Sequence, residues 1–208
     1  MAQANLFGTT IALFRSLNMA FAAAKIPAGV DITQFHLGRS IALWVSAFEI
    51  LTHKGTEDVR LFQVYEQIAA APWKAKSSLR KSYKPYAKKT KEPLPCWIYG
   101  EIHRARNDYL HGNPIEPRRL IVKKSKRHLF NYVAPLYRMA LTGFLPIPKP
   151  DGGDSQAFSR ARYDFIVNQN DIERALSTIR LTEKAYRSKR EAEMKKVKVT
   201  WRSGSQSP

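Results

Sequence analysis

The segment HRARNDYLHGNP, residues 103–114, carries side chains that could act together on a phosphate group. The apolar spacing around it predicts a helix with one buried face, formed by Ile98, Ile102, Ala105 and Tyr109. At 100° per residue, a second face spans about 140° and contains His103, Arg106, Asn107 and His111. This helix would therefore present imidazole, guanidinium and amide groups to one small volume.

Metal-free cleavage of RNA uses groups of these types. A base takes the proton of the ribose 2′-hydroxyl, a cation stabilises the charge that builds on the phosphate, and an acid protonates the leaving 5′-oxygen. Imidazole, with a reference pKa of about 6.5, can perform either proton transfer near neutral pH. Arginine offers a planar fork that matches phosphate oxygens, and asparagine can hold a phosphate oxygen or orient an imidazole. Because DNA lacks the 2′-hydroxyl, this chemistry would act on RNA alone.

An ordinary polar helix end explains the same residues. A histidine directly before a terminal glycine suits the negative end of the helix dipole. An arginine is also unremarkable in a chain that contains 35 Lys and Arg residues. The spacing by itself leaves both interpretations open.

Basic charge is concentrated in the middle of the chain. The net charge is +18, from 35 Lys and Arg against 17 Asp and Glu. Residues 71–145 hold 17 basic and 4 acidic side chains, whereas residues 1–70 hold five of each and residues 146–208 hold 13 and 8. Clustered cations favour a polyanionic partner because they release counterions when they bind phosphates. The alternative is a solvated basic surface with no specific partner.

A basic segment with interleaved tyrosines, residues 74–91, precedes the motif helix. It has eight basic residues and no acidic one. Pro85, together with Pro93 and Pro95 just after the segment, argues against one continuous helix. Cations that follow the backbone and rings that stack on bases suit single-stranded RNA, although a solvated lysine-rich loop has the same composition. The predicted RNA-binding residues are Lys74, Lys76, Arg80, Lys81, Tyr83, Lys84, Tyr86, Lys88, Lys89 and Lys91, with Arg118 and Arg119 after the motif.

The remaining sequence predicts helices that position these segments, and almost no strands. Helical periodicity covers residues 6–25, 31–54 and 58–71, with Asp31 or Thr33 capping the second helix and Gly55 ending it. The motif helix spans residues 95–111, and a helix over residues 125–144 contains Pro135. Residues 170–171 can cap a last helix with Ile172, Leu176 and Ile179 on one side. We therefore predict an all-α fold.

The segment RNDYLHG, residues 106–112, resembles the signature of the HEPN superfamily (higher eukaryotes and prokaryotes nucleotide-binding domains). In that signature an arginine is followed by a polar residue and, four to six positions after the arginine, by a histidine, here Arg106, Asn107 and His111. The upstream segment IALWVSAFEILTHKG, residues 41–55, is similar to the helix before this motif in the ApeA-like branch. The resemblance covers about residues 30–145.

The resemblance implies a fold and an assembly. HEPN domains are antiparallel helical bundles that dimerise, so that two motifs form one composite site across a two-fold axis and supply one histidine for each proton transfer. Residues 1–145, including the basic insert 74–91, are then a HEPN-like domain. Residues 146–158 are a linker by composition, and residues 159–208 are a basic helical extension with a polar tail.

The resemblance also implies an activity. Active members are metal-independent endoribonucleases that leave 2′,3′-cyclic phosphate and 5′-hydroxyl ends, and many act as toxins or in defence against phage. Arg106, Asn107 and His111 are the catalytic residues that it implies, with no cofactor and no metal. RNA, a second copy of the chain, and an antitoxin or complex partner are the implied partners. The alternative is a non-catalytic HEPN subunit that binds RNA within a larger nucleoprotein complex.

Two further residues could support this site. The helix that carries Glu49 should pack beside the motif helix, where a buried carboxylate would pair with Arg106; an exposed pair of Glu49 with His53 is the alternative. His103 could help to bind RNA, and the alternative is a partly exposed polar residue without a role.

Other classes of protein find little support in the sequence. Cys96 is the single cysteine, which excludes an intramolecular disulfide and a multi-cysteine metal site. No phosphate loop, GxGxxG or HExxH motif is present, and no segment indicates a helix-turn-helix for DNA. No segment reaches the roughly 18 to 20 unbroken apolar residues of a membrane span. We expect a cytoplasmic protein without a membrane segment.

Overall fold

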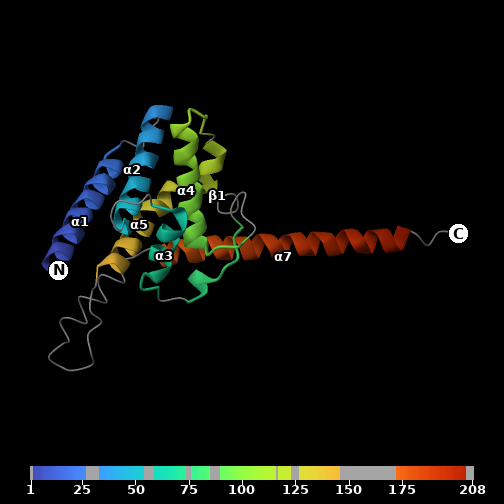
Figure 1. The fold of residues 1–208 in the computed structure, drawn as a ribbon. Coiled ribbons are helices and arrows are strands. Elements are labelled where there is room, and N and C mark those ends of the chain that lie inside the picture. Colours follow the sequence, from blue (N-terminus) through green and yellow to red (C-terminus); the bar gives the residue numbers. More distant parts are fainter. Residues whose placement is uncertain are drawn as a thin grey trace, which may run out of the picture.

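The computed structural model describes residues 2–26, 33–53, 59–73, 76–84, 90–115, 117–122, 127–145 and 172–204. Its α-helices are α1 (Ala2–Ala24), α2 (Gln34–Thr52), α3 (Leu61–Ala70), α4 (Leu94–Leu110), α5 (Phe130–Phe144) and α7 (Ile172–Gly204) (Figure 1). Two 3-10 turns, Lys76–Leu79 and Pro117–Leu120, and a hairpin of β1 (Ile121–Val122) and β2 (Arg127–His128) complete the described elements. The all-α prediction is confirmed. No helix in the described ranges is both long enough and apolar enough to cross a membrane.

Helix α2 lies between α1 and α4 (Figure 1). It runs antiparallel to both neighbours, and α3 and α5 pack against each other beside them. The buried Ser16 hydroxyl ties α1 to the bundle, because it donates to the Ala47 carbonyl at 2.7 Å and lies 2.6 Å from the Tyr137 hydroxyl. Because α1 covers one face of α2, the opposite face of α2 meets the motif helix α4.

A single buried cluster joins the helices. Phe48 of α2 lies 4.9 Å from the ring of Tyr99 in α4 and 5.4 Å from the ring of Tyr137 in α5, measured between centroids. The first turns of α7 contribute to the same cluster through the fully buried Ile172, Leu176 and Ile179. These three residues share one side of the helix, as predicted. Beyond them α7 projects away from the bundle (Figure 1).

Several predicted helix boundaries need correction. Thr33 does cap α2, since its hydroxyl accepts from the His36 backbone N–H at 3.3 Å. The helix ends at Thr52 rather than residue 54, because the Thr52 hydroxyl turns back to the Glu49 carbonyl at 2.9 Å and His53 is extended. Helix α3 begins at residue 61 rather than 58. Its first turn starts where the Gln63 side chain accepts from the Arg60 N–H at 2.7 Å.

The prediction for residues 125–144 was wrong at its start. Residues 127–128 pair with residues 121–122 as a short antiparallel hairpin, with Ile121 opposite His128, so α5 begins only at Phe130. Pro135 lies inside α5 as predicted. At the other end of the chain, α7 continues to Gly204, so residues 202–204 of the predicted polar tail are helical. Gly55, residues 170–171 and the predicted linker 146–158 lie outside the described residues.

Helices α2 and α4 approach each other closely at Gly38. A Cβ placed on this residue would lie 2.1 Å from the Tyr109 ring, so only glycine leaves room for the ring. We expect Gly38→Ala to lower the free energy of unfolding by about 1–3 kcal/mol through overpacking. Urea unfolding would measure the loss, with the exposed neighbour substituted in Arg39→Ala as a control. Equal stability of both variants would contradict this contact.

Candidate active site

Local sequence fixes the position and the length of the motif helix. Pro93 is the N-cap of α4, and a second proline lies in its first turn, where the missing N–H costs no helical hydrogen bond. At the other end Gly112 adopts φ 71°, a left-handed conformation that glycine tolerates, and its N–H donates to the Tyr109 carbonyl at 3.1 Å. The buried face contains Ile98, Ile102 and Ala105, as predicted.

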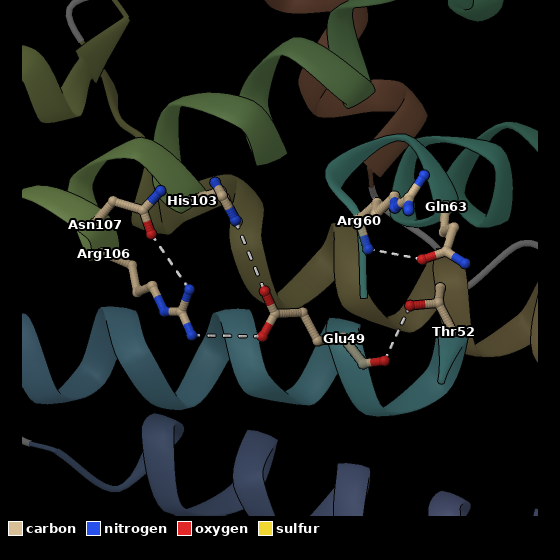
Figure 2. Close-up of polar contacts among 7 residues, drawn as sticks. All are labelled: Glu49, Thr52, Arg60, Gln63, His103, Arg106 and Asn107. Atoms are coloured by element: carbon tan, nitrogen blue, oxygen red, sulfur yellow. Dashed lines mark hydrogen bonds and ion pairs between the residues drawn. The ribbon is translucent and has the colours of Figure 1, made fainter. Parts of the chain in front are cut away.

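Four of the predicted site residues meet between α2 and α4 (Figure 2). The Glu49 carboxylate of α2 places Oε2 3.7 Å from Arg106 Nη2 and Oε1 3.7 Å from His103 Nε2. On its other side Arg106 Nη1 donates to Asn107 Oδ1 at 3.2 Å. The predicted pairing of Glu49 with Arg106 is therefore present, and His103 shares the same carboxylate.

Burial sets the charges in this cluster. It raises the pKa of Glu49, while the Arg106 guanidinium acts in the opposite direction. It lowers the pKa of His103, and Arg106 lowers it further. Both effects favour the neutral imidazole of His103. Both contacts to Glu49 are longer than a hydrogen bond, and the Arg106 side chain keeps 27% of its surface exposed. A phosphate in solvent can therefore reach the guanidinium.

His111 lies one turn beyond Asn107 and outside this cluster. Its backbone N–H donates to the Asn107 carbonyl at 3.0 Å, but its own φ and ψ of −89° and 10° already leave the helix. The side chain is exposed, and within the described parts of the chain its imidazole has no hydrogen bond or ion pair. The structure thus brings together Glu49, His103, Arg106 and Asn107 but leaves His111 at an exposed edge.

The sequence matches no family model, no curated protein and no solved structure. The resemblance to the HEPN superfamily therefore depends on the motif at residues 106–112 and on the helix before it.

The predicted RNA-binding residues have different surroundings. Arg80, Lys81, Lys84, Lys91 and Arg118 are exposed. Tyr83 is half-buried with its ring 5.8 Å from that of Trp97, so it belongs to the bundle surface. Arg119 contacts Asp108 of α4 at 2.6 Å, which holds this cation beside the motif helix. Four of the predicted RNA-binding residues lie outside the described residues: Lys74, Tyr86, Lys88 and Lys89. The side chain of Lys76 is likewise outside them.

Tyr99 belongs to the surroundings of the site, although the sequence indicated only that it lies in the predicted motif helix. Its ring lies 6.1 Å from that of His103, one turn further along α4. Its hydroxyl is buried and has no hydrogen-bond partner among the described residues. Burial and then the charge of Glu49 raise its pKa well above the usual value. Its position four residues before His103, and so on the same side of the helix, was the signal in the sequence that could have placed it here.

Across the described residues, no three His, Cys, Asp or Glu side chains come together as metal ligands would.

Proposed function

We propose that the protein is a metal-independent endoribonuclease of the HEPN type, which cleaves RNA through the 2′-hydroxyl to 2′,3′-cyclic phosphate and 5′-hydroxyl ends. The observation that carries the proposal is the fixed pair of Arg106 and Asn107, joined at 3.2 Å on a partly exposed face of α4. A guanidinium beside an amide offers several donors to the oxygens of one phosphate. His111 lies one helical turn away, at the exposed end of the same helix.

The roles follow from chemistry and position. Arg106 binds the scissile phosphate and stabilises the negative charge of the transition state, while Asn107 holds the guanidinium and donates from its own amide nitrogen. His111 transfers a proton, because imidazole is the side chain suited to do so near neutral pH. The exposed cations Arg80, Lys81 and Lys84 lie on the segment before α4 and can follow the RNA backbone.

A homodimer is part of the proposal. The exposed end of α4 leaves His111 accessible to a second copy, and a two-fold axis there would bring two imidazoles to one composite site. A ribonuclease that acts in the cytoplasm of the cell that makes it must be inhibited there. An inhibitory antitoxin or a partner subunit therefore belongs to the same proposal. A role as a toxin or in phage defence would fit such an enzyme.

Cleavage in the absence of metal tests the proposal. Purified protein is incubated with RNA in excess EDTA, and the product ends are analysed. We expect 2′,3′-cyclic phosphate ends, and a loss of about 10²–10³-fold in rate for Arg106→Ala, since one charge-stabilising contact is removed. Arg106→Lys keeps the charge but not the planar fork, so its rate should fall between the two. Equal rates for all three proteins would show that a contaminant cuts the RNA.

A non-catalytic RNA-binding subunit is the second candidate. The observation in its favour is the Glu49 carboxylate, which already neutralises Arg106 at 3.7 Å as a purely structural ion pair would. Such a protein would retain RNA through its exposed cations, without producing new ends. Tight binding with no cleavage in the EDTA experiment, at any pH between 5 and 9, would support this candidate over the enzyme.

A further inference from the structure

The contact between Glu49 and His103 has no part in the mechanism given above. We propose that His103 is the general base of the reaction and that Glu49 is the residue that positions it; this inference rests on the proposed ribonuclease function. The two residues come from different helices, α2 and α4, and face each other across their interface (Figure 2). The second imidazole that RNA cleavage needs would then be His103, in the same chain as the phosphate-binding arginine, in place of the His111 of a second copy.

One carboxylate links the base to the phosphate-binding group. Oε1 of Glu49 faces His103 Nε2 and Oε2 faces Arg106 Nη2, each at 3.7 Å. A phosphate on Arg106 is therefore next to the imidazole, and the adjoining ribose can present its 2′-hydroxyl there. His111 has no such contact among the described residues and is accessible from solvent. It is therefore suited to protonate the leaving 5′-oxygen.

The ring nitrogens of His103 have different surroundings. Nε2 is directed to Glu49, and Nδ1 makes no hydrogen bond with the described residues. The negative charge of Glu49, 3.7 Å from Nε2, favours the neutral tautomer that carries its proton on Nε2. That tautomer leaves Nδ1 as the acceptor. The His103 side chain is 18% exposed, which leaves it reachable from the solvent side of the cluster.

The charges around His103 suit a base. The groups that face it are Glu49 from α2, with Arg106 and Tyr99 from its own helix. Burial and Arg106 both lower the pKa of His103 and so favour the neutral ring. Once the ring accepts a proton, the adjacent Glu49 carboxylate offsets the new positive charge. A carboxylate whose only role was to pair with Arg106 would have no need of an imidazole on its other oxygen.

The proton transfers balance in this arrangement. The 2′-O–H bond breaks and its proton moves to His103 Nδ1, while the 2′-oxygen forms a bond to phosphorus. The bond from phosphorus to the 5′-oxygen breaks, and that oxygen takes a proton from His111. His103 then gives one proton to water and His111 takes one from water, which returns both imidazoles to their starting states.

The experiment compares the pH dependence of RNA cleavage in wild type, His103→Ala and Glu49→Gln, with EDTA present throughout. Because the reaction uses both a base and an acid, the wild-type rate should follow a bell-shaped pH profile. Its rising limb should end where the pH passes the pKa of His103, which lies below the usual value. His103→Ala should lose about 10²-fold or more of the rate together with this rising limb. Added imidazole should restore part of the rate. In Glu49→Gln the limb should move to lower pH, because a negative charge that favours the imidazolium is gone.

The possible results distinguish the role of His103 from the ribonuclease function itself. Wild-type cleavage with an equally active His103→Ala would overturn the role of His103 and leave the ribonuclease function standing. A slow His103→Ala variant whose rising limb is unchanged, and which imidazole does not restore, would show a structural role and also overturn the inference. No cleavage by wild type would overturn both proposals. The control is His36→Ala, an exposed histidine at the start of α2 that should cut as wild type does. Thermal unfolding of every variant checks that it is folded.

Discussion

Truncation of His111 to alanine is expected to lower the rate of RNA cleavage by about 10²–10⁴-fold, the usual contribution of a proton-transferring group. The surroundings of His111 indicate that this substitution removes the imidazole without disturbing the fold. His111 is exposed, it follows the last residue of α4, and its imidazole has no bonding partner within the described residues. Its loss should therefore change the free energy of unfolding by no more than about 0.5 kcal/mol. The expected variant is folded, binds RNA and does not cut it.

The measurement is single-turnover cleavage of a defined RNA, together with RNA binding and thermal unfolding of the same samples. Asn113→Ala is the matched control, because Asn113 is exposed two residues further along. Its one hydrogen bond with the described residues runs from its backbone N–H to the Asp108 carbonyl, at 2.8 Å. We expect this control to cut at the wild-type rate. If His111→Ala and Asn113→Ala were equally active, His111 would have no catalytic role.

Replacement of Phe48 by alanine is expected to lower the free energy of unfolding by about 3–5 kcal/mol, the usual effect of truncating a buried phenylalanine. Phe48 is 1% exposed and contacts aromatic rings from both α4 and α5. Its loss would leave a cavity at the junction of three helices. It also precedes Glu49 in α2, so the Glu49 carboxylate should lose its fixed position relative to α4.

Chemical denaturation measures this effect. Phe62→Ala is the control, because Phe62 in α3 is 48% exposed and its truncation should cost much less. If both phenylalanines contributed equally, the packing around Phe48 would be wrong. Cleavage by the Phe48→Ala protein, measured where it is still folded, should fall as well because Arg106 loses its anchored neighbour.

The sequence predicted the motif helix well because its signals are local. Two prolines at its start, a glycine at its end and a period of 3.6 residues need no knowledge of the tertiary structure. The pairing of Glu49 with Arg106 was open until the packing of α2 on α4 was known, since an exposed contact with His53 satisfies the same helical spacing. The helical wheel also placed His111 among its neighbours by angle, yet the chain leaves the helix at that residue.

Other features required contacts that a single sequence does not contain. The strands formed by residues 121–122 and 127–128 have two residues each, which is too short for an alternating pattern to be recognised. The proximity of Tyr99 to Glu49 depends on which face of α4 meets α2. The carboxylate shared by His103 and Arg106 likewise depends on the distance between two helices.

The projecting helix α7 has a length that its number of turns determines. It has 33 residues, which at 1.5 Å per residue span about 50 Å. Its first eight residues contain the three isoleucine and leucine side chains buried in the bundle. The remaining 25 residues extend about 37 Å beyond them. The exposed cations Lys184, Arg187 and Lys189 on that part lie at increasing distances from the bundle, each set by its position along the helix.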